Sequence, residues 1–188
     1  RGYVNTIGAV TGRMTHSHPN MAQVPSTSSP YGKECRECWT VDKDYRLVGI
    51  DASGLELRML AHYMNDEGFT YELLNGDIHT ANQMAAGLES RPQAKTFIYA
   101  LLYGAGDAKL GSVVGGDAKD GGRLRQSFFD NLPAFKNLKD RVARASKRGY
   151  LKGLDKRKLF VRSEHAALNT LLQGAGAIVM KQALVNLQ

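Results

Sequence analysis

Several features are scarce in this 188-residue sequence, and each absence narrows the possibilities. No apolar run reaches the roughly 20 residues that a membrane-spanning helix needs. Only two cysteines occur, Cys35 and Cys38, whereas a structural zinc site needs four ligands. His16 and His18 could complete such a site, but their spacing resembles no known zinc module, so we favour reduced thiols. The first residue is not methionine and the last ones follow an apolar helical pattern, so we expect a piece of a longer protein.

Acidic residues are also scarce in one part of the chain. The net charge is +7, but residues 119–162 alone hold 14 Lys and Arg against four Asp, a net of +10. A solvated lysine-rich surface is the ordinary explanation of such a run, yet this excess is more than solubility requires. We therefore interpret it as a surface for the phosphates of a nucleic acid. With 43% hydrophobic residues, the chain can bury a core in one domain or two joined subdomains.

Residues 91–104 give the main functional signal. Arg91, Lys95, Tyr99 and Tyr103 recur at intervals of four, so on a helix they share a stripe roughly 18 Å long. The cations would lie near the helix N-terminus, which favours phosphate, and the two rings could carry a sugar and a base. The spacing alone fits equally well a solvated basic helix end with two half-buried tyrosines. The apolar residues between them predict packing against a core: Phe97, Ile98, Leu101 and Leu102.

The first part of the chain predicts short β structure and one acidic site. Residues 1–12 alternate as in a β-hairpin, and residues 11–25, with Arg13, read as a polar loop that could contact DNA. Residues 47–50 are an apolar run that predicts a strand, followed by Asp51 and a helical pattern from Ser53. An acid at the end of a buried strand is a candidate metal ligand. Ser53 and Glu56 have the spacing of a capping box.

The second part predicts mostly helices. A helix starts near residue 77, with Asp77 or Thr80 as its cap and His79 at its positive end. Residues 111–122 are glycine-rich and predict a loop, and residues 124–148 predict a basic helical region broken by Pro133. Residues 149–162 predict a β-like or irregular connection. The last helical segment carries a second polar row at intervals of four: His165, Asn169 and Gln173.

Three of these stretches together resemble the polymerase domain of the family-A DNA polymerases, most nearly the replicative enzymes of short-tailed bacteriophages. Residues 51–58 look like the first catalytic motif, residues 91–104 look like the nucleotide-binding fingers helix, and residues 11–13 look like the loop beside the primer. The resemblance implies an α+β, mostly helical fold, part of a right-hand polymerase. It places a palm part at residues 1–62, fingers at 63–162 and a palm helix at 163–188.

The resemblance also implies a role for each matching residue. Asp51 would hold two Mg²⁺ ions with help from the carbonyl of Ala52, and it would act in catalysis together with Lys95 and Tyr99. The dNTP would contact the following residues: Ala52, Glu56, His79, Arg91, Lys95, Tyr99 and Tyr103. Within this set, Glu56 would lie beneath the sugar and exclude a 2′-hydroxyl. The primer-template DNA would contact a further set: Arg13, His165, Asn169 and Gln173.

The implied function is template-directed DNA synthesis, with nucleotidyl transfer from a dNTP to a primer 3′ end in the cytoplasm of an infected bacterium. Primer-template DNA and dNTPs are the expected partners, and no membrane is involved. The alternatives are a single-subunit RNA polymerase or a catalytically silent nucleic-acid-binding module. The family's third motif, a His-Asp-Glu triplet, does not occur here, nor do the thumb and exonuclease domains. We therefore expect the chain to bind DNA but to extend primers poorly. Because Pro92 disfavours helical angles at Arg91, we expect Arg91 to be an N-cap residue.

Overall fold

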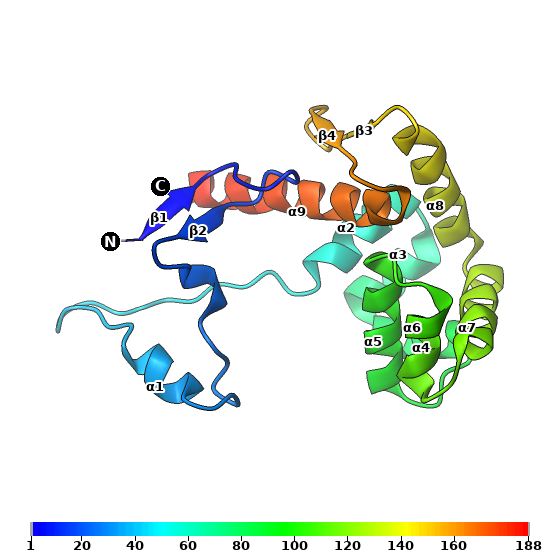
Figure 1. Cartoon of the computed structure of the whole chain (residues 1–188), viewed down its shortest axis with the longest axis horizontal. Coiled ribbons are helices and arrows are strands. Elements are labelled where there is room, and N and C mark those ends of the chain that lie inside the picture. Colours follow the sequence, from blue (N-terminus) through cyan, green and yellow to red (C-terminus); the bar gives the residue numbers. More distant parts are fainter. Residues whose placement is uncertain (1, 188) are drawn as a thin grey trace. The chain divides into compact units, whose positions relative to one another are not determined.

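Helices dominate the secondary structure of the computed structural model, which describes residues 2–187 (Figure 1). Four short strands form two separate two-stranded sheets within this range. The predicted α+β, mostly helical class is therefore confirmed. Contacts divide the chain into two units, Arg1–Ser53 and Gly54–Gln188. Arg1 and Gln188, the ends of the predicted palm segments, lie outside the described residues. The division into palm and fingers stays a prediction.

The first unit contains one small antiparallel hairpin. Strand β1 (Tyr3–Asn5) pairs with β2 (Thr15–Ser17), and Val4 lies opposite His16. The prediction of a hairpin within residues 1–12 is thus wrong for its second strand, which falls in the stretch that we had assigned to a loop. Backbone hydrogen bonds around Gly12 close the connection instead, because its positive φ of 79° permits a tight turn there. A 3₁₀ turn, η1 (Met21–Gln23), and helix α1 (Gly32–Glu37) complete the unit.

The segment before the second unit contradicts two predictions. Residues 47–50 form no strand, and Leu47, Val48 and Ile50 are 71%, 76% and 72% exposed. A strand needs a neighbour for its backbone hydrogen bonds, and within residues 2–187 no strand pairs with this segment. The predicted capping box is also wrong. Gly54, in a left-handed conformation, is the N-cap of the next helix, so Ser53 and Glu56 do not have the capping-box positions.

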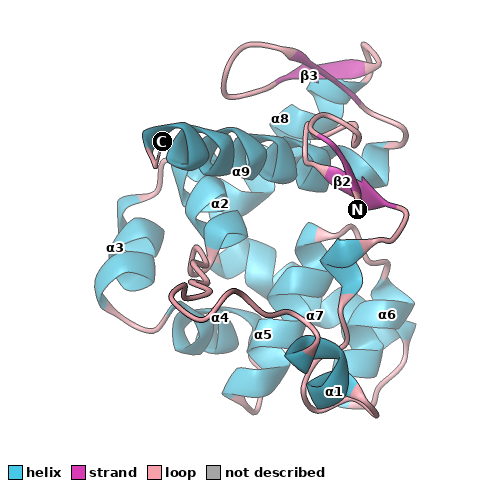
Figure 2. Ribbon diagram, turned by 90° about the vertical axis from the view of Figure 1, so that its left-hand side faces the viewer, coloured by secondary structure: helices cyan, strands magenta, loops and turns pink. Residues whose placement is uncertain are grey.

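Gly54–Gln188 is built from helices and one hairpin (Figure 2). The elements, in chain order, are α2 (Leu55–Met64), α3 (Glu67–Asn75), α4 (Ile78–Ala86), α5 (Arg91–Leu102), α6 (Asp107–Gly111), η2 (Ser112–Val114), α7 (Ala118–Asn131), α8 (Pro133–Ser146), β3 (Tyr150–Lys152), β4 (Lys158–Phe160), η3 (Glu164–Ala166) and α9 (Ala167–Asn186). The predicted break at Pro133 is confirmed, since proline starts α8 where its missing N–H costs no hydrogen bond. The β-like connection at residues 149–162 is confirmed as β3 and β4.

The core holds α5 in place. Phe97 and Ile98 are fully buried, and the Phe97 ring lies 5.7 Å from that of Phe128, which in turn lies 5.4 Å from Phe135. Edge-to-face rings at these distances add to the stabilisation from burial. The Phe97 ring thereby joins α5 to α7, and α4 lies alongside α5. Although α9 has 20 residues, no helix in the described range is long and apolar enough to span a bilayer.

The glycine-rich stretch at residues 111–122 is not a loop, as the sequence predicted, but a tight helical junction. It contains the end of α6, η2 and the start of α7. A Cβ on Gly111 would lie 1.8 Å from the carbonyl oxygen of Asp117, and one on Gly121 would lie 1.9 Å from that of Asp107. Glycine is needed here because two backbones approach more closely than any side chain allows.

Candidate functional site

The two cations in the polar row of α5 point away from the core, whereas Tyr99 packs partly against it. Arg91 and Lys95 are exposed, Tyr103 is 51% exposed, and Tyr99 is half-buried. The intervening apolar residues are buried, so they fix the rotation of the helix about its axis. The helix ends where Gly104, with a φ of 79°, turns the chain. The row is therefore exposed at its cationic end and only partly exposed at its aromatic end.

Ser90, and not Arg91, caps α5, so our N-cap prediction for Arg91 is wrong. The Ser90 side chain accepts a hydrogen bond from the backbone N–H of Gln93, and the Gln93 side chain accepts one from the N–H of Ser90 at 3.1 Å. This reciprocal capping box holds Arg91 in the first turn in spite of Pro92. Proline is tolerated there because first-turn N–H groups have no helical partner. Arg91 consequently starts the helix, beside its positive end.

Asp77 holds the Arg91 side chain, which the sequence did not predict. The guanidinium donates to the Asp77 carboxylate from Nε at 2.6 Å and from Nη2 at 3.2 Å. The same carboxylate caps α4 by accepting from the backbone N–H of His79 at 3.1 Å and from Thr80 Oγ1 at 2.8 Å. Hydrogen bonds from Arg91 and then from Thr80 hold the pKa of Asp77 well below its usual range. The carboxylate that starts α4 thus also orients the first cation of α5.

His79 lies beside this ion pair. Burial, followed by the nearby positive charge of Arg91, lowers the pKa of His79, so its ring is neutral at pH 7. Its Nδ1 is buried and has no hydrogen-bond partner. The ring centroid lies 6.4 Å from that of Tyr99 on α5. His79 is therefore placed between the cationic and the aromatic parts of the row.

Tyr99 lies next to an acid from another helix. Its pKa is raised by burial first, then by the charge of Glu56 on α2 and by Tyr103. Because Glu56 takes no part in a capping box, its carboxylate is available for another role. Helices α2, α4 and α5 thus bring six predicted residues together, which we call the α5 cluster: Glu56, His79, Arg91, Lys95, Tyr99 and Tyr103.

The second polar row is only partly continuous with a helix. His165 is exposed in η3, whereas Asn169 and Gln173 are half-buried in α9. A Cβ on Gly104 would lie 2.3 Å from the carbonyl oxygen of His165, so the end of α5 packs against the backbone that begins this row. The structure therefore brings His165 next to the turn that follows the α5 cluster.

The remaining predicted residues belong to the other unit. Asp51 and Arg13 are exposed, and Ala52 is half-buried. Residues 2–187 contain no group of three or more His, Cys, Asp or Glu side chains that could hold a metal ion. The role of Asp51 and the Ala52 carbonyl as metal ligands therefore stays a prediction. A zinc site gains no support either, since Cys35 and Cys38 are free thiols and the Cys38 Sγ donates to the Glu34 carbonyl.

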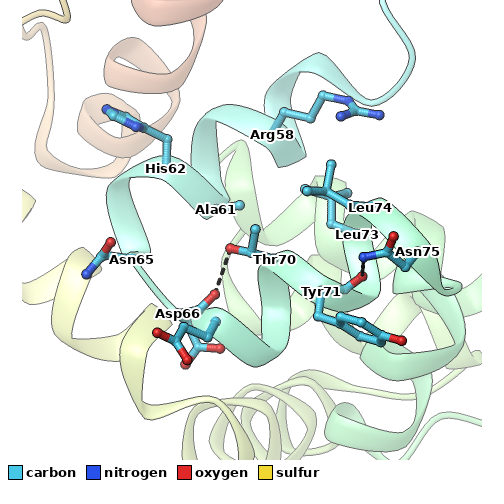
Figure 3. A pocket seen from close by; sticks show the side chains of 11 residues that line it. Arg58, Ala61, His62, Asn65, Asp66, Thr70, Tyr71, Leu73, Leu74 and Asn75 are labelled. Carbon is cyan, nitrogen blue, oxygen red and sulfur yellow. Dashed lines mark hydrogen bonds between the residues drawn. The ribbon is translucent and has the colours of Figure 1, made fainter.

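A cavity of about 630 Å³ lies between α2 and α3 (Figure 3). Its walls come from the exposed side of α2 and from both ends of α3, where Thr70 Oγ1 donates to the Asp66 carbonyl at 2.7 Å. None of the predicted site residues lines it. Two prominent wall residues, Tyr71 and Leu74, are more than half exposed. This cavity is therefore separate from the α5 cluster.

Comparison with known proteins adds independent findings. Residues 1–188 match the family described as DNA polymerase family A. The chain is 49% identical over 206 residues to a DNA-directed DNA polymerase of Enterobacteria phage T3 and 48% identical over 206 residues to that of Escherichia phage T7. In both cases the match covers 96% of this chain and 29% of the relative's length.

A solved structure shows the same fold. The POL domain of Pol1 from M. smegmatis, in complex with DNA primer-template and dNTP, matches with a TM-score of 0.83. The match covers 98% of this chain and 36% of that chain at 24% sequence identity, so it shows the fold alone. This chain thus spans less than a third of the length of the phage relatives.

Proposed function

Because the chain belongs to DNA polymerase family A, we propose that it carries the nucleotide-binding part of an enzyme for template-directed DNA synthesis. This enzyme transfers a nucleotide from a dNTP to the 3′ end of a primer. The observation that carries the proposal is the α5 cluster, in which two cations and two tyrosines follow α5 and His79 of α4 lies beside them. The phage relatives are DNA-directed DNA polymerases, and an infected bacterium is the proposed setting.

The triphosphate lies at the cationic end of the cluster. Arg91 and Lys95 are exposed in the first turns of α5, where backbone N–H groups also favour an anion. Phosphoryl transfer requires mainly positioning and neutralisation of charge, which two cations and a hydrogen-bonding histidine supply. His79, as a neutral ring, acts as a hydrogen-bond donor to phosphate and not as a third cation. Lys95 is the proposed catalytic cation because, unlike Arg91, it has no acidic partner among the ion pairs of residues 2–187.

The sugar and base lie at the aromatic end. Tyr99 stacks on the incoming nucleotide, and Tyr103 shapes the pocket one turn further on. Glu56 is close enough to Tyr99 to raise the pKa of its hydroxyl, so the acid lies beside the position of the sugar. A carboxylate there disfavours a ribose 2′-hydroxyl, which argues for deoxyribonucleotides. The position of Glu56 beside Tyr99 argues against the RNA polymerase alternative, and the phage relatives, which are DNA-directed DNA polymerases, do not support it.

DNA and metal contacts complete the proposed site. Asn169 and Gln173 on α9, with His165 before them, are proposed to contact the primer-template together with Arg13. Asp51 and the Ala52 carbonyl are the proposed Mg²⁺ ligands in this chain. Mg²⁺ would neutralise charge on the phosphates as the bond to the leaving group breaks. These two residues supply one carboxylate, so they are only part of a two-ion site.

A silent binding module remains the second candidate for the chain alone. The observation in its favour is the net charge of +10 at residues 119–162, which suits DNA whether or not chemistry follows. Primer extension by the purified chain separates the candidates. A polymerase part with one metal carboxylate should bind primer-template and dNTP and extend primers poorly, whereas a silent module should bind DNA without dNTP selectivity.

Nucleotide binding is the direct test. The purified chain is titrated with dGTP in the presence of Mg²⁺, and Lys95→Ala is compared with Lys109→Ala, an equally exposed lysine on α6. A charge-assisted contact contributes about 1.5 to 3 kcal/mol, so Lys95→Ala should weaken binding by about 10-fold or more. Lys109→Ala should not change it. Equal affinities of both variants and the unmodified chain would refute the proposed triphosphate site.

A further inference from the structure

The β3–β4 hairpin presents an unusual outer face. Its register places Tyr150 opposite Phe160, Leu151 opposite Leu159, and Lys152 opposite Lys158. Leu151 and Leu159 are buried, and side chains alternate along a strand. The other two pairs therefore share the outward side, which we call the hairpin face: Tyr150, Lys152, Lys158 and Phe160. Phe160 is 65% exposed although it is a large apolar residue.

The charges on this face are uncompensated. Lys152 and Lys158 occupy directly opposite positions, an arrangement of like charges that destabilises a strand pair. The hairpin acid Asp155 is engaged by Arg157, and no ion pair within residues 2–187 involves Lys152, Lys158 or Arg148. Two of these cations are held against the Tyr150 ring. Lys158 Nζ lies 4.8 Å and Arg148 Cζ lies 5.5 Å from the ring centroid.

We propose that the hairpin face binds single-stranded DNA, with Phe160 stacked on one base and Lys152, Lys158 and Arg148 on the flanking phosphates. The choice of DNA over another polyanion rests on the proposed function. Tyr150 fixes two of the cations by cation–π contact, so less of their side-chain freedom is lost on binding. An aromatic ring stacks on any base without reading its identity, so the contact is independent of sequence.

Other partners fit the face less well. In a duplex the bases are already stacked on each other, so Phe160 would have no base to receive. An acidic peptide would pair with the cations but would leave the exposed Phe160 ring without a stacking partner. An apolar protein surface would bury Phe160 but would also have to desolvate three unpaired cations. A single strand can place its phosphates on the cations and stack an unpaired base on Phe160.

The test uses the purified 188-residue chain and a fluorescein-labelled 12-mer of thymidine, with binding followed by anisotropy at several salt concentrations. Phe160→Ala should weaken binding by about 5-fold or more, since stacking contributes roughly 1 to 3 kcal/mol per base. Its salt dependence should not change. Phe160→Trp should restore affinity. The double variant Lys152→Gln/Lys158→Gln should flatten the salt slope by about 1.4, at roughly 0.7 per phosphate on a single strand.

Controls make each outcome decisive. Lys109→Gln, outside the hairpin, should leave affinity unchanged, and circular dichroism should show that every variant folds. Unchanged affinity of both Phe160→Ala and the double lysine variant would overturn the proposal. A 12-residue glutamate peptide provides a second such outcome. If it bound as tightly as the DNA and its affinity fell in the lysine variant but not in Phe160→Ala, the proposal would be overturned, because the partner would then be an acidic protein. Binding of dGTP should be unaffected in all hairpin variants, which separates this proposal from the nucleotide site.

Discussion

The α5 cluster and the segment that carries Asp51 differ in what holds them in place. The cluster residues lie on helices α2, α4 and α5, except for Tyr103 directly after α5, and Phe97 and Ile98 fix α5 with no exposed surface. The segment at residues 41–53 forms no helix or strand, and its apolar side chains are more than 70% exposed at Leu47, Val48 and Ile50. The proposed nucleotide-binding residues and the proposed metal ligand are thus held under very different constraints.

The difference follows from where backbone hydrogen bonds are made. A helix satisfies its own N–H and C=O groups, so α5 needs its neighbours only for side-chain packing. A strand depends on another strand for the same groups. The residues of the α5 cluster are therefore preassembled within residues 54–187, whereas the proposed metal ligand lies on a segment with no secondary structure of its own.

The largest expected effect is on stability and contrasts the two regions directly. Phe97→Ala should lower the free energy of unfolding by about 3 to 5 kcal/mol, because it leaves a cavity beneath α5. Ile50→Ala should change it by less than about 0.5 kcal/mol, because Ile50 is 72% exposed. Urea unfolding followed by circular dichroism measures both. A large loss in Ile50→Ala would show that residues 47–50 are packed in solution.

Two adjacent glycines sharpen the comparison within the helical part. Gly121→Ala should destabilise the protein by about 1 to 3 kcal/mol, because its Cβ would clash with the Asp107 backbone at 1.9 Å. Gly122→Ala meets only an ordinary contact at 3.6 Å and should stabilise α7 by about 0.5 to 1 kcal/mol. Thermal unfolding of the two variants should move in opposite directions. Stabilisation by both would mean that α6 and α7 are not in close contact.

Asp77→Asn tests whether the ion pair competes with a ligand. Asparagine is also a good N-cap, so α4 should be retained while the carboxylate charge is lost. Arg91 is then released for phosphate, and we expect only about 2- to 5-fold tighter binding of tripolyphosphate, since an exposed ion pair holds its partners weakly. Calorimetric titration measures the change. Weaker binding would show instead that Asp77 must orient Arg91 for the ligand.

The smallest expected effect is on the titration of His79. Burial and Arg91 lower its pKa in the free protein, so protonation opposes folding and stability should fall as the pH drops below about 6.5. Tripolyphosphate brings negative charge to the ring and should raise the pKa of His79. NMR titration of the histidine ring, assigned with His79→Gln, follows this shift. A pKa that stays the same with saturating ligand would remove His79 from the proposed phosphate contacts.

The sequence predicted local patterns better than it predicted long-range contacts. The intervals of four on α5, the Asp77 cap of α4 and the break at Pro133 depend on neighbouring residues, and the structure agrees with each. The strand at residues 47–50 was wrong because its hydrophobic pattern carries no information about a pairing partner. The N-cap assignment of Arg91 was wrong because the reciprocal Ser90 and Gln93 contacts outweigh the preference that Pro92 imposes.

The sequence by itself determined the helical character of this protein and the order of its polar and apolar faces, because these depend on spacing along the chain. Tertiary structure decided which distant residues meet. Asp77 holds Arg91 and Glu56 approaches Tyr99 only because α2, α4 and α5 pack together. The close approach at Gly111 and Gly121 likewise depends on backbones that are ten residues apart, and a one-dimensional pattern cannot distinguish such a junction from a flexible loop.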